Sequence, residues 1–426
     1  PYFDENVEIS QYPDIPNNEF TRDEILSMLA KEMLDAAELL PASQSEVGRI
    51  HKYIALAYAA KIKLYQAYQQ DETTHAVTSI NKELLREVVS LCDQVTASNR
   101  YGLLDDFQGL DLVANENGKE SVFAIQYSMN DGTESAGRIN WSNLLNSPGG
   151  GSPYGGDGFF LPSQDLINAY QTDANGLPDF NYQSKSDYSW AVLNNGVYTL
   201  QNTTPNVDPR LDFVVGRPTI TWKTYPDKPC EGWVRDKETY GYNCAKRFWV
   251  SPESSDMFNG WPWGASQLNW QIIRYADILL WKAEALIELN EGDGLETARD
   301  LINQIRNRAR NSAYVKDFND HSKYAANYLV NPYPADVWNQ DYARQALRWE
   351  TRLEKALEGE RFFDLVRWGI VETTMNKYIT AESDNRIYYA NAHFTGGKDE
   401  YYPVPNNQYG FSGGKYVQNP GYAPFN

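Results

Sequence analysis

The fold is decided by the stretch from Trp270 to Arg310, WQIIRYADILLWKAEALIELNEGDGLETARDLINQIRNRAR. In its first half, apolar residues recur at the period of an α-helix, about 3.6 residues. They are Ile272, Ile273, Ala276, Leu279, Leu280, Ala283, Leu286 and Ile287. The opposite side of the helical wheel carries Arg274, Asp277, Trp281, Glu284 and Glu288. This pattern predicts a helix that starts near Trp270 and buries one face.

A second helix follows after the short polar turn at 290–294. Its apolar positions are Leu295, Ala298, Leu301, Ile302, Ile305 and Ala309. Two amphipathic helices on so short a connection are expected to pack antiparallel. Neither helix can bury its apolar stripe alone, so further helices must lie beside the pair, as in stacked helix-pair repeats.

The same stretch carries a motif, RYADILL at 274–280 followed by AEA at 283–285. Further motifs are DPRL at 208–211, RL at 352–353, EGERFFDLVRWG at 358–369, YPVP at 402–405 and QNPGY at 418–422. In these motifs and in their order the chain resembles the SusD/RagB family, the outer-membrane nutrient-binding lipoproteins of Bacteroidota.

The resemblance implies a mostly α-helical SusD-like scaffold of tetratricopeptide-type helix pairs with a long loop-rich insertion that contains short strands. It also implies a function: a non-catalytic, lipid-anchored protein on the outer face of the outer membrane, which captures a glycan and delivers it to a TonB-dependent SusC-like transporter. Residues 23–41 correspond to the interior of a complete family member. We therefore expect the family's opening helices, signal peptide and lipid-carrying cysteine to be absent from this chain, which leaves part of the ligand site and an apolar helix face without their neighbours.

Four regions follow from the periodicity along the chain. Residues 1–101 form a helical block that begins with the capping box Thr21-Arg22-Asp23-Glu24. Residues 102–269 form the loop-rich insertion and the candidate ligand-binding region, with strands at 121–127 and 212–222 and a helix at 163–170. Residues 270–380 form the helix-pair block, with a long helix from 341 to 357, and residues 381–426 form an irregular tail packed on the scaffold.

Composition excludes several classes of protein. The 426 residues include 38 basic and 57 acidic residues, a net charge of −19 that repels a phosphate backbone and excludes a nucleic-acid partner. No apolar run reaches the roughly 18 residues that a membrane span needs, so membrane contact is expected only through a lipid anchor that this chain does not include. The four histidines share neither a helical face nor metal-ligand spacing with cysteine, so we expect no metal and no cofactor.

Catalytic patterns are weak. No GxSxG elbow, P-loop lysine or HExxH pair is present. The most tempting carboxylates for glycoside hydrolysis are Glu354, Glu358, Glu360 and Asp364. They lie among Arg352, Arg361 and Arg367, so ion pairs that brace helices are the better interpretation. We expect no enzyme activity.

Aromatic residues give the positive signal for binding: 30 Tyr and 12 Trp help to bring the aromatic fraction to 14%. Many lie between Trp222 and Trp270, where glycines and charges break any core period. Sugar rings present apolar C–H faces that stack on indole rings, and Trp261-Pro262-Trp263 offers two indoles separated by a rigid proline. The residues predicted to bind the ligand are Trp261, Trp263, Trp233, Trp249, Tyr240, Tyr242, Asn259, Trp141 and Tyr154. Trp222 and Trp270 border regular elements and are expected to seal the insertion onto the helices.

Alternatives remain open at this point. A peptide-binding RagB-like member of the same family would use backbone pairing in place of aromatic stacking. A polysaccharide-active enzyme would need two carboxylates about 5 to 10 Å apart beside the indoles. The sequence favours Cys92 as a small core residue and leaves the pairing of Cys230 with Cys244 undecided.

Overall fold

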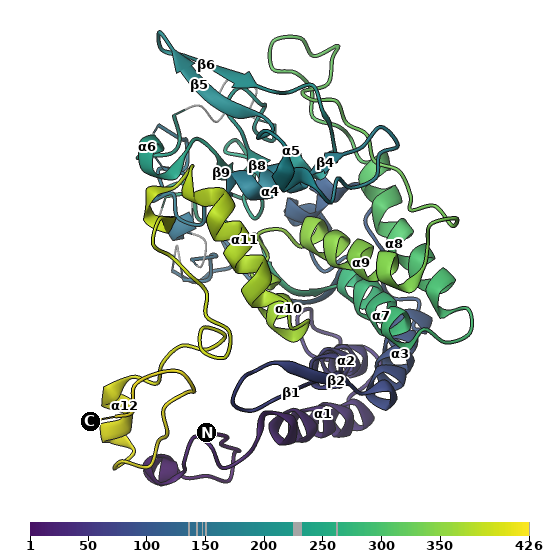
Figure 1. Cartoon of the computed structure of the whole chain (residues 1–426), viewed down its shortest axis with the longest axis vertical. Coiled ribbons are helices and arrows are strands. Elements are labelled where there is room, and N and C mark those ends of the chain that lie inside the picture. The colour runs from purple at the N-terminus through teal and green to yellow at the C-terminus, as the bar shows by residue number, and fades with distance from the viewer. Residues whose placement is uncertain are drawn as a thin grey trace.

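The computed structural model describes residues 1–134, 137–141, 144–146, 148–149, 151–224, 232–260 and 263–425. Stacked helices form its lower and right-hand parts, and a loop-rich insertion with short strands lies above them (Figure 1). The main helices are α1 (Arg22–Leu39), α2 (Lys52–Ala67), α3 (Lys82–Ala97), α7 (Tyr275–Leu289), α8 (Gly294–Asn311), α9 (Gln340–Glu354), α10 (Arg361–Arg367) and α11 (Val371–Ser383).

The helices pack in sequence, each on the next: α1 on α2, α2 on α3, α3 on α7, and α7 on both α8 and α9. One apolar cluster passes through α2, α3, α7, α8 and α9, so helices on either side of the insertion share a core. This confirms the predicted scaffold of helix pairs. Cys92 is fully buried within that cluster, as expected of a small core residue.

The first of these helices begins as predicted. The Thr21 hydroxyl accepts the Glu24 N–H and the Glu24 carboxylate accepts the Thr21 N–H, which completes the capping box. Along α1 only Ala30 and Ala37 are buried, so the larger apolar side chains of this helix keep partial contact with solvent.

Within the described residues the strands are short and form two-stranded sheets. The pairs are β1 (Tyr68–Gln70) with β2 (Val77–Ile80), β3 (Ser121–Ile125) with β10 (Trp270–Arg274), β4 (Gln171–Thr172) with β7 (Asn206–Val207), β5 (Trp190–Asn194) with β6 (Val197–Gln201), and β8 (Val215–Gly216) with β9 (Cys244–Ala245). Short helices complete the chain: α4 (Gln164–Ala169), α5 (Arg210–Val214), α6 (Lys237–Tyr240) and, in the tail, α12 (Asn406–Phe411). The two termini lie near each other, and Asn17 hydrogen-bonds the Val417 backbone (Figure 1).

Two predicted elements are wrong. Residues Trp270–Arg274 form strand β10 and the helix starts only at Tyr275, because the strand pairs antiparallel with β3. Ile272 and Ile273 fit a helical wheel, but the long-range partner overrides that local pattern. The stretch 212–222 is also not one strand, because α5 continues to Val214 and only Val215–Gly216 is extended within a sheet.

The polar side of α7 is buried as deeply as its apolar side. Arg274 is 1% exposed, and its guanidinium contacts Glu120 (2.8 Å), Glu354 (3.0 Å) and Glu358 (2.7 Å). The wheel therefore located this polar face correctly, but the face packs against charged side chains of opposite sign from other elements, as Glu284 does against Arg367. A single buried face was predicted, whereas ion pairing buries both.

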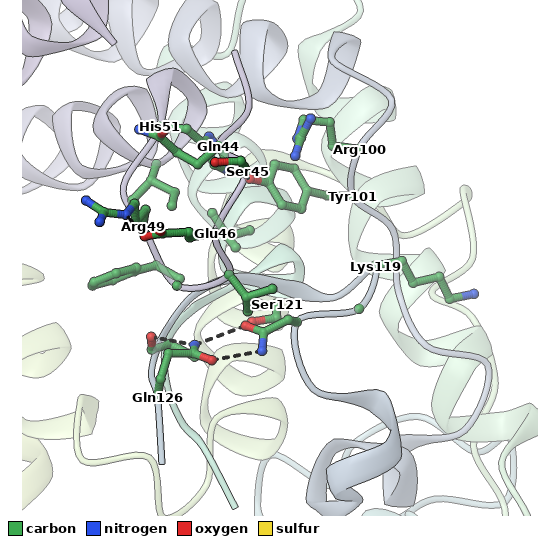
Figure 2. A pocket seen from close by; sticks show the side chains of 18 residues that line it. Gln44, Ser45, Glu46, Arg49, His51, Arg100, Tyr101, Lys119, Ser121 and Gln126 are labelled. Carbon is green, nitrogen blue, oxygen red and sulfur yellow. Dashed lines mark hydrogen bonds and ion pairs between the residues drawn. The ribbon is translucent and has the colours of Figure 1, made fainter. Parts of the chain in front are cut away.

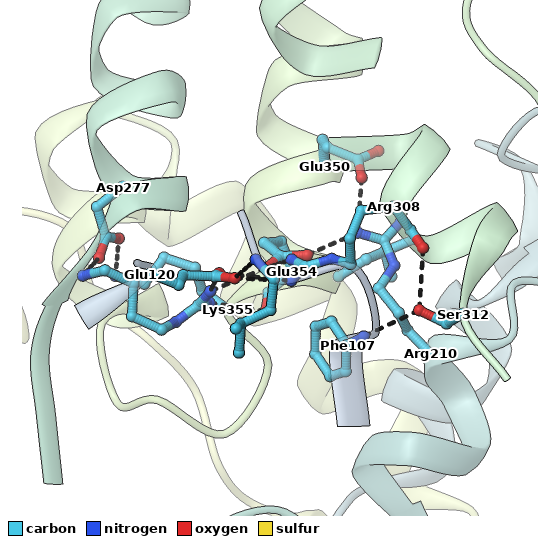
Figure 3. A network of polar contacts seen from close by, with 12 residues as sticks. Phe107, Glu120, Arg210, Asp277, Arg308, Ser312, Glu350, Glu354 and Lys355 are labelled. Atoms are coloured by element: carbon cyan, nitrogen blue, oxygen red, sulfur yellow. Dashed lines mark hydrogen bonds and ion pairs between the residues drawn. The ribbon is translucent and has the colours of Figure 1, made fainter. Parts of the chain in front are cut away.

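Glu354 lies at the centre of this network (Figure 3). Its carboxylate meets Arg210 (3.1 Å), Arg274 (3.0 Å) and Arg308. Burial alone would raise the pKa of Glu354, but these three guanidiniums outweigh it and lower the pKa to about 2. The network thus fastens α9 to the start of α7, to α8 and to the insertion helix α5.

A second buried carboxylate behaves in the opposite way. Glu382, near the end of α11, is 1% exposed and accepts the backbone N–H of Asp165 in α4. Burial raises the pKa of Glu382 to about 7 and exceeds the opposing effect of that hydrogen bond. The folded chain therefore holds a proton on Glu382 across a pH range in which the unfolded chain does not.

The proton on Glu382 makes the stability of the protein depend on pH. Because the pKa is raised on folding, the stabilising effect of Glu382 is present below about pH 4.5 and is lost as the pH rises through about 7. The free energy of unfolding of the wild type should therefore fall by roughly 2 to 3 kcal/mol more than that of Glu382→Gln between pH 5 and pH 8. Urea unfolding of both proteins at the two pH values measures it, and parallel pH profiles would contradict it.

Candidate ligand-binding surface

The aromatic residues of the insertion divide into a buried cluster and an exposed set. The buried cluster contains Tyr154 (0% exposed), Trp222 (0%), Trp233 (2%) and Trp249 (2%). The ring centroids of Trp222 and Trp233 lie 4.9 Å apart at 69°, an edge-to-face contact. The Trp222 indole N–H donates to the Tyr154 hydroxyl (3.0 Å), which donates to the Val250 carbonyl (2.6 Å).

This cluster corrects part of the prediction. Trp233, Trp249 and Tyr154 were expected to offer exposed rings, and that expectation is wrong because other rings cover them. The four side chains form the small core that holds the insertion loops together. Trp222 is buried, as expected, and Trp270 is partly buried with its ring 4.7 Å from that of Phe248.

Two tryptophans on neighbouring segments remain open to solvent. Trp263 is 53% exposed and Trp141 is 48% exposed. Asn140 pairs with Ser266 as an antiparallel bridge, with its N–H 2.8 Å from the Ser266 carbonyl, so the segment that carries Trp141 runs beside the segment that carries Trp263.

Asn259 lies on the same projection as Trp263. Met257 also pairs with Ser266, and the Phe258 N–H donates to the Ala265 carbonyl (2.8 Å), so the segment that carries Asn259 runs antiparallel to the segment after Trp263. Asn259 is exposed. Trp261 and Pro262 lie outside the described residues. We call Trp141, Trp263 and Asn259 the tryptophan surface.

Tyr240 and Tyr242 belong to a different part of the insertion. Tyr240 ends α6, is 46% exposed and contacts Tyr388 at a centroid distance of 6.0 Å. Tyr242 is partly buried against Tyr198 of β6, 5.4 Å away. Their ring contacts therefore connect α6 to the β5–β6 hairpin and to the segment after α11.

The sequence reasoning missed two exposed rings, Phe159 (60%) and Phe160 (47%). They end the glycine-rich stretch, and Gly155 of that stretch passes beside Trp263, since a Cβ at Gly155 would lie 3.7 Å from the Trp263 Cβ. A signal was available: two adjacent phenylalanines follow a stretch with no helical or strand period, where no core could be expected to bury them.

A separate polar pocket of about 490 Å³ lies between the loop before α2 and strand β3 (Figure 2). Asn117 and Gln126 exchange two side-chain hydrogen bonds (2.9 and 3.0 Å) at one end of it. At the other end the Tyr101 hydroxyl lies 3.2 Å from His51 Nε2. Amides and hydroxyls of this kind suit a hydroxylated ligand, and no pattern in the sequence predicted that they would meet.

The tempting carboxylates are committed to ion pairs, but of the three arginines that the sequence suggested, only Arg367 pairs with one of them. Glu358 contacts Arg247 and Arg274, Glu360 contacts Lys61 and Lys355, and Asp364 contacts Arg367. Most of these partners come from other elements of the chain. The described residues include no group of three or more histidine, cysteine or acidic side chains arranged to hold a metal ion.

The structure describes only one of the two cysteines whose pairing the sequence left undecided. Cys244 is buried with its Sγ 3.6 Å from the Gly216 carbonyl, and Cys230 lies outside the described residues.

No helix in the described ranges is both long and apolar enough to cross a membrane.

Comparison with solved structures shows the same fold in several proteins. A SusD superfamily protein from Bacteroides vulgatus is 20% identical, with a TM-score of 0.65 over 96% of this chain and 71% of that one. A SusD-like carbohydrate-binding protein from Bacteroides fragilis is 20% identical, with a TM-score of 0.63 over 95% and 73%. Surface glycan-binding protein A from Bacteroides thetaiotaomicron is 17% identical, with a TM-score of 0.55 over 95% and 72%.

No curated protein matches the sequence. The sequence profile of the SusD family matches residues 119–422, which include most of the insertion, the α7–α8 pair and the tail. The match covers more than half of the chain and agrees with the helix-pair scaffold and the insertion described above, so this chain belongs to the SusD family.

Proposed function

We propose that this chain binds a glycan on the tryptophan surface without catalysis. The observation that carries the proposal is the pair of solvent-exposed indoles, Trp141 and Trp263, presented on adjacent segments that backbone hydrogen bonds hold together. Exposed indoles with a nearby amide such as Asn259 suit stacking on the apolar face of a sugar. Family membership and the carbohydrate-binding and glycan-binding relatives support the same ligand class.

The proposal includes the role that family membership implies. The protein is anchored by lipid on the outer face of the outer membrane and passes its glycan to a SusC-like TonB-dependent transporter. The peptide-binding alternative would have been favoured by burial of both Trp261 and Trp263, and Trp263 is 53% exposed while Trp261 lies outside the described residues. The enzyme alternative needed two carboxylates about 5 to 10 Å apart beside the indoles. The candidate acids are instead paired with arginine or lysine.

Affinity electrophoresis on gels containing neutral polysaccharides tests the proposal, with laminarin first because one SusD-like relative binds it. We expect Trp263→Ala and Trp141→Ala each to lower retention at least about tenfold, since base or sugar stacking on an aromatic ring contributes on the order of 1 to 3 kcal/mol. Melting temperature should change little, because both rings are about half exposed.

Trp190→Ala is the matched control. Trp190 is 45% exposed but lies on the β5–β6 hairpin, outside the tryptophan surface. Its retention should equal that of the wild type. Loss of retention in Trp190→Ala together with normal retention in both other variants would move the site away from the tryptophan surface.

A further inference from the structure

A cavity of about 390 Å³ lies between the insertion and the last scaffold helices. Its walls come from α4, the end of α9 and the turn after it, α10 and α11, which lie close together in the fold (Figure 1). The volume is within the range of small-molecule sites in proteins. None of the residues that form the tryptophan surface lines it.

Most of the cavity wall is apolar. The contributing side chains include Phe160, Leu166, Leu357, Phe362, Leu365 and Met375. Phe160 is 47% exposed and lies at the insertion side of the cavity. Such a wall favours the hydrocarbon or aromatic part of a ligand and offers few hydrogen-bond partners to the hydroxyl groups of a sugar.

The charged groups that line the cavity are paired, with one exception. Arg352 contacts Asp165 (2.7 Å) and the Tyr182 hydroxyl (2.9 Å). Lys355 contacts Asp277 and Glu360, the latter at 3.1 Å. Arg352 and Lys355 are thus already paired with three carboxylates before any ligand is considered.

Arg361 is the exception. Its Nη1 is shielded from solvent without a hydrogen-bond partner, and within the described ranges no carboxylate forms an ion pair with its guanidinium, which lies over the Trp368 ring at 5.9 Å. Burial, with the like charge of Arg352 second, lowers the pKa of Arg361 to about 9. The Arg361 side chain as a whole is partly exposed, so its cation can reach a ligand in the cavity, but the shielded Nη1 lacks the anionic partner that a desolvated guanidinium usually has.

We propose that this cavity binds a small organic anion whose carboxylate pairs with Arg361 and whose hydrocarbon body lies against the apolar wall. The unpaired guanidinium supplies the charge, and Phe160, Phe362 and Met375 supply the apolar contact. The site is independent of glycan binding, since it shares no residue with the tryptophan surface.

Isothermal titration calorimetry of the full chain with hexanoate, 3-phenylpropanoate, hexanamide and glucuronate tests the proposal. At least one of the two apolar carboxylates should bind about tenfold tighter than hexanamide and glucuronate, which lack the charge or the apolar body. Absence of heat from both apolar carboxylates up to about 10 mM, or equal binding by the amide, would overturn it.

Two variants localise the site. Arg361→Met keeps the length and apolar stem of the side chain, so it should abolish carboxylate binding while the melting temperature stays equal or rises. Phe160→Ala should weaken 3-phenylpropanoate at least about threefold with an unchanged melting temperature, because the ring is half exposed. Wild-type affinity in both variants would refute the site, and glycan retention should remain normal in each.

Discussion

Replacing Glu354 by glutamine is expected to lower the free energy of unfolding at pH 7 by about 3 to 5 kcal/mol. The substitution removes a carboxylate that contacts Arg210, Arg274 and Arg308 together, and each of these arginines is at most 5% exposed. The amide cannot replace that charge, so the arginines keep only their other carboxylate partners, such as Asp208 for Arg210 and Glu120 for Arg274 and Arg308, and the buried cluster loses one negative charge. Urea unfolding of the variant and of the wild type measures the difference.

The lowered pKa of Glu354 predicts how this loss of stability depends on pH. Because folding lowers the pKa of Glu354 to about 2, its contribution is complete above about pH 4.5 and is lost as the pH falls through 2. The difference between wild type and Glu354→Gln should therefore shrink at pH 3. Asp35→Asn, which breaks the exposed pair with Lys31 in α1, is the control and should change stability by no more than about 0.5 kcal/mol. A similar small effect at Glu354 would show that the buried network contributes nothing net.

The second large effect is expected at Trp233. Trp233→Ala should destabilise the protein by about 3 to 5 kcal/mol, because the ring is 2% exposed and its removal leaves a cavity beside Trp222 and Tyr154. Trp263→Ala is the matched comparison, since the same side chain is deleted from a half-exposed position, and it should cost less than about 1 kcal/mol. Thermal unfolding of the two variants separates a core ring from a surface ring.

Equal destabilisation by the two substitutions would contradict the division of the insertion aromatics into a buried cluster and an exposed surface. A Trp233→Ala variant that keeps its stability but loses glycan retention would show that Trp233 belongs to the ligand site.

The helical scaffold was predictable because its information is local. In α8, the apolar positions from Leu295 to Ala309 repeat at helical spacing, and the observed helix, Gly294–Asn311, extends only a little beyond them. The capping box at Thr21 was equally readable, since both of its hydrogen bonds join residues three apart. The strand β10 was not predictable, because its partner β3 lies about 150 residues earlier and no local period specifies that pairing.

The candidate site was only partly predictable for a related reason. Sequence composition identified an aromatic-rich region but could not say which rings share a core. Trp233 and Trp263 stand in similar surroundings of glycine and charge, yet Trp233 lies against Trp222 and Tyr154 and Trp263 is half exposed to solvent. That difference depends on contacts across the insertion, such as the indole of Trp222 with Tyr154, 68 residues away.

The antiparallel pairing of β3 with β10 has a consequence for how such proteins diversify. Ser121 stands opposite Arg274 and Ile125 opposite Trp270. The two ends of the segment between β3 and β10 therefore lie side by side. A change of length within segment 126–269 leaves the spacing of its two ends unaltered, provided that Arg210 still reaches Glu354. A segment transplanted between these strands therefore has to supply two ends that fit β3 and β10 and a cation in the place of Arg210.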